Sequence, residues 1–99
     1  MVEILLPVHD NQGRPFEESM FTRVREELTD RFGGATAFTR APAQGTFDDR
    51  GQVQRDDIVI FEVMTPTLDR RWWASYRERL QQHFAQDEIV IRCMRIERL

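Results

Sequence analysis

The sequence contains no lysine, and all 14 of its basic residues are arginines. It has a single cysteine, Cys93, which excludes an intramolecular disulfide and any CxxC motif for a metal or a redox reaction. No apolar run approaches the ~20 residues that a membrane-spanning helix needs. We therefore expect a soluble protein of the reducing cytoplasm that has no membrane partner.

The charge balance argues against nucleic acid as a partner. The chain has 17 acidic and 14 basic residues and a formal net charge of −3, whereas nucleic acids attract basic surfaces through their phosphates. Arginine without lysine would suit the recognition of planar anions. However, the arginines are scattered along the sequence, which is more typical of codon bias in a GC-rich genome than of an anion site.

A length of 99 residues fits one domain, and 40% hydrophobic with 31% charged residues is ordinary globular composition. We therefore predict a single domain that spans residues 1–99. The domain is organised around residues 58–64, IVIFEVM, in which six of seven residues are apolar and most are β-branched or aromatic. A strand that is apolar on both faces is expected at the centre of a sheet.

Three more strands are indicated by alternating apolar residues or by β-branched residues. They are predicted at residues 2–8, 35–40 and 89–96, and the middle one is the least apolar, as an edge strand would be. Residues 41–57, which precede the central strand, contain two glycines and four aspartates. This composition indicates an extended arm or a long loop.

Two amphipathic helices are predicted between the strands. The first runs from Pro15 to Phe32 with apolar residues at spacings of three and four, and Gly33-Gly34 ends it. The second follows Thr65-Pro66, a pair typical of an N-cap and a first helical residue. Trp73 lies at the border of its apolar stripe, which is formed by Leu68, Trp72, Tyr76, Leu80 and Phe84.

The resulting order is strand, helix, strand, strand, helix, strand, which predicts an α+β ferredoxin-like fold, the βαββαβ sandwich. Right-handed crossovers put both helices on one face of a four-stranded antiparallel sheet and the first and third strands in its middle. The other face, which we call the open face, has no helix to cover it.

The open face should be polar in a monomer, but the alternation of the strands assigns many apolar side chains to it. We therefore predict a homodimer in which a second copy covers this face, as in dimeric α/β barrels. An arm or tail of the same chain folded over the face is the alternative. The predicted interface residues are Leu5, Ile58, Ile60, Met64, Val90 and Met94.

Several polar residues interrupt the open face, Glu3 and Thr36 among them, and three ionisable ones are the candidates for ligand binding: Glu62, Arg92 and His9. A carboxylate and a guanidinium beside apolar walls would anchor a small acid or form a proton-transfer pair. The structural alternative is an ion pair between Glu62 and Arg92 at the interface, because neither charge can be buried alone.

Three short pieces of the sequence carry a family resemblance. They are residues 31–38 (RFGGATAF), residues 43–47 (AQGTF) and the helix pattern formed by Leu68, Asp69, Trp72 and Trp73. Together they resemble a family of small uncharacterised bacterial ferredoxin-like proteins. The resemblance implies a bacterial protein with a ferredoxin-like fold and no established activity.

Motifs of the common catalytic classes are missing from the sequence. His9, His83 and Cys93 lack the spacing of metal ligands, and we expect neither a metal nor a cofactor. We therefore predict a small dimeric module with an accessory or ligand-sensing role, which binds a small molecule or, through residues 41–57, a protein partner. The alternative is a small cofactor-free enzyme, an isomerase or oxygenase of the dimeric α/β barrel type, with its site between the sheet and the dimer mate.

Overall fold

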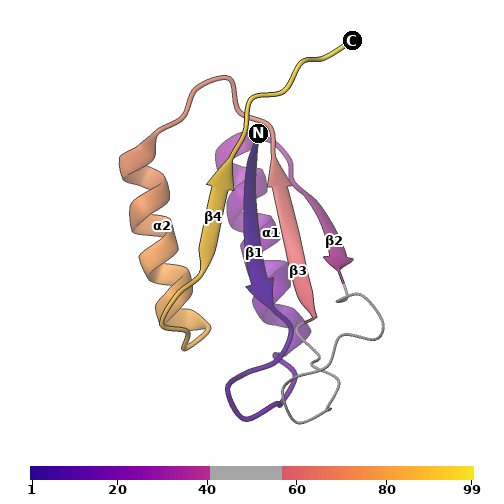
Figure 1. Cartoon of the computed structure of the whole chain (residues 1–99), viewed down its shortest axis with the longest axis vertical. Coiled ribbons are helices and arrows are strands. Elements are labelled where there is room, and N and C mark those ends of the chain that lie inside the picture. The colour runs from indigo at the N-terminus through magenta and orange to yellow at the C-terminus, as the bar shows by residue number, and fades with distance from the viewer. Residues whose placement is uncertain (41–56) are drawn as a thin grey trace, which may run out of the picture.

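A computed structural model describes residues 1–40 and 57–99, so the predicted arm at residues 41–57 lies almost wholly outside the described residues. The elements are β1 (Val2–Pro7), α1 (Glu18–Phe32), β2 (Thr36–Arg40), β3 (Ile58–Val63), α2 (Arg70–His83) and β4 (Val90–Cys93). The four strands form one antiparallel sheet in the order β2-β3-β1-β4 (Figure 1). This arrangement confirms the predicted ferredoxin-like α+β fold.

The two middle strands, β1 and β3, set the two faces of the sheet. Val2 lies opposite Val63, and Ile4 lies opposite Phe61. All four side chains are buried, because this face is the one that the helices cover. Since side chains alternate along a strand, the residues between them belong to the open face. β2 lies at an edge of the sheet, as its polar composition predicts.

α1 begins at Glu18, three residues later than the sequence pattern predicts. Pro15 forms a β-bridge with His9 instead, and the N–H of Phe16 donates to the carbonyl of Val8 at 2.9 Å. These contacts keep the chain extended up to Glu17, the N-cap residue. The helix ends at Gly33 as predicted, because the left-handed φ of 83° at this C-cap suits glycine.

α2 begins at Arg70, so the prediction that Thr65-Pro66 starts this helix is wrong. The N-cap is Asp69, whose carboxylate accepts a hydrogen bond from the N–H of Trp72 at 3.1 Å. The hydroxyl of Thr65 donates to the carbonyl of Thr67 and so stabilises a turn in the connection before the helix. An aspartate that satisfies a free N–H is among the strongest helix starts, and it determines the boundary here.

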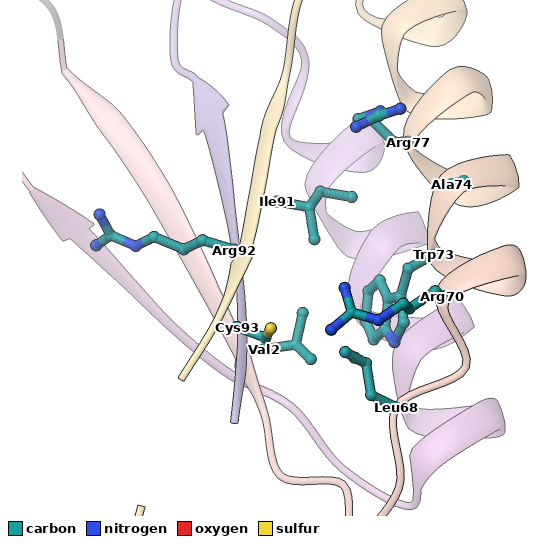
Figure 2. A pocket seen from close by; sticks show the side chains of 9 residues that line it. All are labelled: Val2, Leu68, Arg70, Trp73, Ala74, Arg77, Ile91, Arg92 and Cys93. Carbon is teal, nitrogen blue, oxygen red and sulfur yellow. The ribbon is translucent and has the colours of Figure 1, made fainter. Parts of the chain in front are cut away.

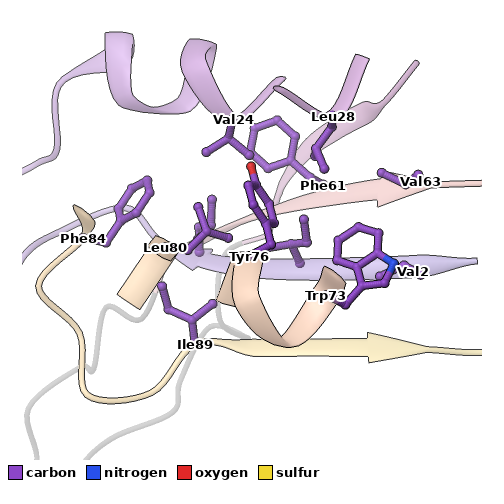
Figure 3. Close-up of a cluster of buried hydrophobic side chains, with 12 residues drawn as sticks. Val2, Val24, Leu28, Phe61, Val63, Trp73, Tyr76, Leu80, Phe84 and Ile89 are labelled. Atoms are coloured by element: carbon purple, nitrogen blue, oxygen red, sulfur yellow. The ribbon is translucent and has the colours of Figure 1, made fainter. Parts of the chain in front are cut away.

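Both helices pack on the same face of the sheet and enclose one apolar core (Figures 1 and 3). The prediction for the two tryptophans is wrong, because Trp73 is in the core and Trp72 is only half-buried. Trp72 stacks on the ring of Tyr76 beneath the guanidinium of Arg31. The buried core consists of Val2, Ile4, Leu6, Val24, Leu28, Phe61, Val63, Trp73, Tyr76, Leu80, Phe84 and Ile89.

β4 is shorter than predicted and ends at Cys93. The N–H of Met94 still donates to the carbonyl of Met1 at 2.9 Å, but the chain then leaves the sheet. Residues 94–99 continue beyond the end of the sheet as a segment without regular structure (Figure 1). Within the two described ranges, no helix has both the length and the apolarity that crossing a bilayer requires.

Candidate functional site

The open face carries two rows of side chains that run across the strands. The strand register aligns an apolar row in the order Phe38, Ile60, Leu5, Val90. The neighbouring row, which we call the charged row, aligns Thr36, Glu62, Glu3 and Arg92. The candidates Glu62 and Arg92 therefore lie in the same row, with strand β1 between them.

Glu3 occupies the position between these two candidates, and its carboxylate is the partner of Arg92. The Nε of Arg92 donates to Oε1 of Glu3 at 2.8 Å. The side chain of Glu3 is only 8% exposed, whereas that of Arg92 is 46% exposed. Because a buried carboxylate needs a cation or hydrogen-bond donors, Arg92 stabilises Glu3 in its place.

Arg92 has a different partner from the Glu62 that the sequence suggests. The expected ion pair between Glu62 and Arg92 is replaced by the pair of Arg92 with Glu3, because β1 lies between β3 and β4. Glu62 is half-buried, and it forms no salt bridge within residues 1–40 and 57–99. Glu3 and Glu62 lie directly opposite each other on neighbouring strands, a placement in which like charges repel.

His9, the third candidate, lies apart from the charged row. It follows the end of β1 and forms a β-bridge with Pro15. Six residues along a straight strand span at most roughly 20 Å, and His9 lies past the end of β1, whereas Glu3 lies near its start. The structure thus brings together Glu62 and Arg92 through Glu3 and leaves His9 outside this group.

The predicted interface residues fall into two groups. Leu5, Ile58 and Val90 lie on the open face, and Val90 is 47% exposed. Ile60 differs from the expectation of an exposed side chain, because it is only 2% exposed in the single chain, although it does not belong to the core cluster under the helices.

The other two predicted interface residues, Met64 and Met94, lie beyond the ends of β3 and β4. They are exposed, and both line a cavity at this end of the sheet. The walls of this cavity come from the connection between β3 and α2 and from the segment after β4, two stretches that are far apart in the sequence, so its pattern does not predict the cavity.

Glu3 is the charged residue of the charged row that is missing from the candidates named from the sequence. Its parity already places it on the open face with Glu62 and Arg92, so the signal for its direction was present. What the sequence did not give is the register, which makes Glu3 the neighbour of both residues.

Metal coordination finds no support in the described part of the chain, which contains no group of three or more His, Cys, Asp or Glu residues arranged to hold an ion. The charged row offers two carboxylates and one guanidinium beside an apolar row. Such a set can pair charges across an interface or hold a small polar ligand.

Comparisons with known proteins identify the fold and no family. Neither a family model nor a curated protein sequence matches the chain. Among solved structures, it is similar to a phage SAM lyase in complex with S-methyl-5′-thioadenosine, with a TM-score of 0.56 and 11% sequence identity. The match covers 91% of this chain and 75% of that chain. At this identity the similarity shows a shared fold.

Proposed function

We propose that the protein is a small homodimeric module with an accessory or ligand-sensing role and that the open face is its dimer interface. The observation that carries the proposal is the apolar row, which has a large exposed side chain at each end. Phe38 is 41% exposed and Val90 is 47% exposed. They lie in one row with Leu5 and Ile60 on the face that the helices leave open, and exposed apolar side chains in such a place are typical of an interaction site.

The charged row supports a second copy as the partner. A two-fold axis that lies between two facing sheets and runs along β1 exchanges the places of β3 and β4, because these strands flank β1 on opposite sides. The axis sets Glu62 of each copy opposite Arg92 of the other. Glu62, which has no salt bridge to a described residue, thereby gains a cation.

A pair of substitutions to glutamate tests the dimer. Val90→Glu introduces a charge into the apolar row, and we expect monomers in sedimentation velocity. Leu68→Glu is the matched control, because Leu68 is 37% exposed but lies in the connection before α2. Both positions are exposed, so both variants should fold. A dimeric Val90→Glu variant, or equal disruption by Leu68→Glu, would refute the interface.

The ligand-sensing part of the proposal has support from the structural comparison. The similar solved structure holds S-methyl-5′-thioadenosine, so one chain of this fold type binds a small molecule. The family resemblance of residues 31–38 and 43–47 stays a prediction and adds no ligand.

The second candidate is that the protein is a small cofactor-free enzyme, and the surroundings of the Glu62 carboxylate favour it. This carboxylate is half-buried beside the apolar row, and the cation of the charged row is already bound to Glu3. A carboxylate in such surroundings is suited to act as a general base. The similar solved structure is a lyase, so SAM is the first substrate to test.

If the protein is such an enzyme, the wild type should release S-methyl-5′-thioadenosine from SAM, as measured by chromatography. The Glu62→Gln variant should not release this product. Product that persists in Glu62→Gln would remove Glu62 as the base. If the wild type releases no product, the protein is not a SAM lyase, and the accessory or ligand-sensing role is favoured.

A further inference from the structure

A cavity of about 780 Å³ lies between the connection from β3 to α2 and the segment that follows β4. A smaller cavity of about 140 Å³ lies beside it towards α2, and the two share Val2, Leu68, Arg70 and Cys93 as lining residues. We call the combined space the arginine groove. The larger cavity alone is within the range of roughly 300–1,000 Å³ that is usual for small-molecule sites.

The charged side chains of the groove all have one sign. Arg70 and Arg77 of α2 line it on one side, and Arg95 and Arg98 line it on the other. The lining includes no aspartate or glutamate, and none of the four arginines forms a salt bridge with a described residue. Arg92 contributes backbone, because its side chain points across the sheet to the other face (Figure 2).

The beginning of α2 adds to the positive charge of the groove. Arg70 is the first residue of the helix, and the first turn contains no acidic residue. The N-terminal end of a helix favours anions, so a cation there is unfavourable unless something offsets it. Asp69 is already engaged, because it caps the N–H of Trp72 and lies 3.7 Å from Arg31. Sequences break such local rules mainly where function requires it.

The remaining walls of the groove are apolar. Met64, Met94 and Ile96 are 60%, 42% and 42% exposed, and Leu68 is 37% exposed. Figure 2 shows Trp73 behind Arg70, at the helix side of the smaller cavity. A site with arginines on opposite walls and apolar side chains between them suits a ligand that has both a negative charge and an apolar part.

We propose that the arginine groove binds a small organic anion, a carboxylate or a phosphate joined to an apolar body. Guanidinium groups bind both anions through paired N–H donors, and the apolar walls accept the body. The inference rests on the ligand-sensing role proposed above, for which it names a site and a ligand class, but it does not depend on the dimer.

Cys93 provides the measurement, because it is exposed, lines both cavities and is the only cysteine of the chain. The rate at which the neutral reagent iodoacetamide modifies it reports whether the groove is occupied. We expect phenylacetate or phenyl phosphate to slow the reaction several-fold at saturation. Their relative effect distinguishes a carboxylate from a phosphate ligand. Neutral phenylacetamide, which has the same ring, should not slow it.

Two arginine variants test whether the groove itself holds the anion. Arg70→Gln should raise the concentration needed for protection about tenfold, as expected for the loss of one charge-assisted contact. Arg71→Gln is the matched control, since it removes the same charge from the next residue, which does not line the groove.

Three results would overturn the anion site: protection by phenylacetamide, an equal loss in Arg71→Gln, or no protection by either anion. The oligomeric state of the same samples keeps the two proposals separate. A monomer that shows protection would refute only the dimer, and a dimer without protection would refute only the groove.

Discussion

The two faces of the sheet bury neighbouring residues in different ways. On the covered face, Phe61 is 1% exposed and packs in the core formed with both helices. On the open face, the adjacent Ile60 is 2% exposed, yet it belongs to an apolar row whose ends are exposed. The next row holds the buried carboxylate of Glu3 opposite Glu62. The apolar side chains of the covered face are thus buried within one chain. The open face still has exposed apolar side chains and a carboxylate without a salt bridge to a described residue, and a partner can contact both.

The largest expected effect distinguishes a core residue of the covered face from an exposed residue of the apolar row. Phe61→Ala should lower the free energy of unfolding by about 3–5 kcal/mol at every protein concentration, because it leaves a cavity in the core. Val90→Ala should have a cost that grows with protein concentration, because Val90 is 47% exposed in the single chain and its loss weakens the association that stabilises the wild type. Urea denaturation at two concentrations measures both. A cost for Val90→Ala that does not change with concentration would contradict a role of the open face in association.

The second prediction concerns the charged row. Arg92→Met leaves the carboxylate of Glu3 buried without its donor and should cost about 1–3 kcal/mol of unfolding free energy. The double variant with Glu3→Gln should cost less than the sum of the single changes, because the charge that needs a partner is gone. Additive costs would contradict the coupling of Glu3 and Arg92.

Arg31→Met is the control for this prediction. Its pair with Asp69 is 3.7 Å long, and the two side chains are 47% and 60% exposed. Exposed pairs contribute little, so we expect a loss of less than about 1 kcal/mol. An equal loss from Arg31→Met would show that the effect at Arg92 is not due to the burial of Glu3.

The smallest effect at neutral pH is expected on the covered face, at Tyr76. Its hydroxyl is buried and has no hydrogen-bond partner within the described residues. Tyr76→Phe should therefore change the unfolding free energy by about 1 kcal/mol or less at pH 7.

At alkaline pH, Tyr76 should have a larger effect on the free energy of unfolding. Burial, and after it the charge of Glu27, raises the pKa of Tyr76 well above its ordinary value of 10.0. Above that ordinary value the unfolded chain loses the proton while the folded chain keeps it, so stability falls as the pH rises. The chain has one tyrosine and no lysine, which leaves few other groups to titrate in this range. Unfolding curves should show the decline in the wild type and a smaller one in Tyr76→Phe; equal declines would contradict the assignment.

Much of the fold was accessible from the sequence, because its hydrophobic patterns are strong. The apolar residues 58–64 predicted the central position of β3, and Gly33 predicted the end of α1. The helix starts were placed less well. A carboxylate cap at Asp69 and a β-bridge at Pro15 determine them, and both depend on contacts that a hydrophobic period does not encode.

The site was only partly predictable, because residues that are distant in the sequence become neighbours through register and topology. Parity put Glu62 and Arg92 on one face, but only the register shows that Glu3 stands between them. The arginines looked scattered along the chain, yet the fold brings Arg70, Arg77, Arg95 and Arg98 to one groove.

The most direct test of the central claim, that a second copy covers the open face, is the molar mass of the wild-type protein in solution. Sedimentation equilibrium at micromolar concentration measures it without any substitution. The account predicts twice the 11.8 kDa mass of the chain. A single species with the mass of one chain would contradict it.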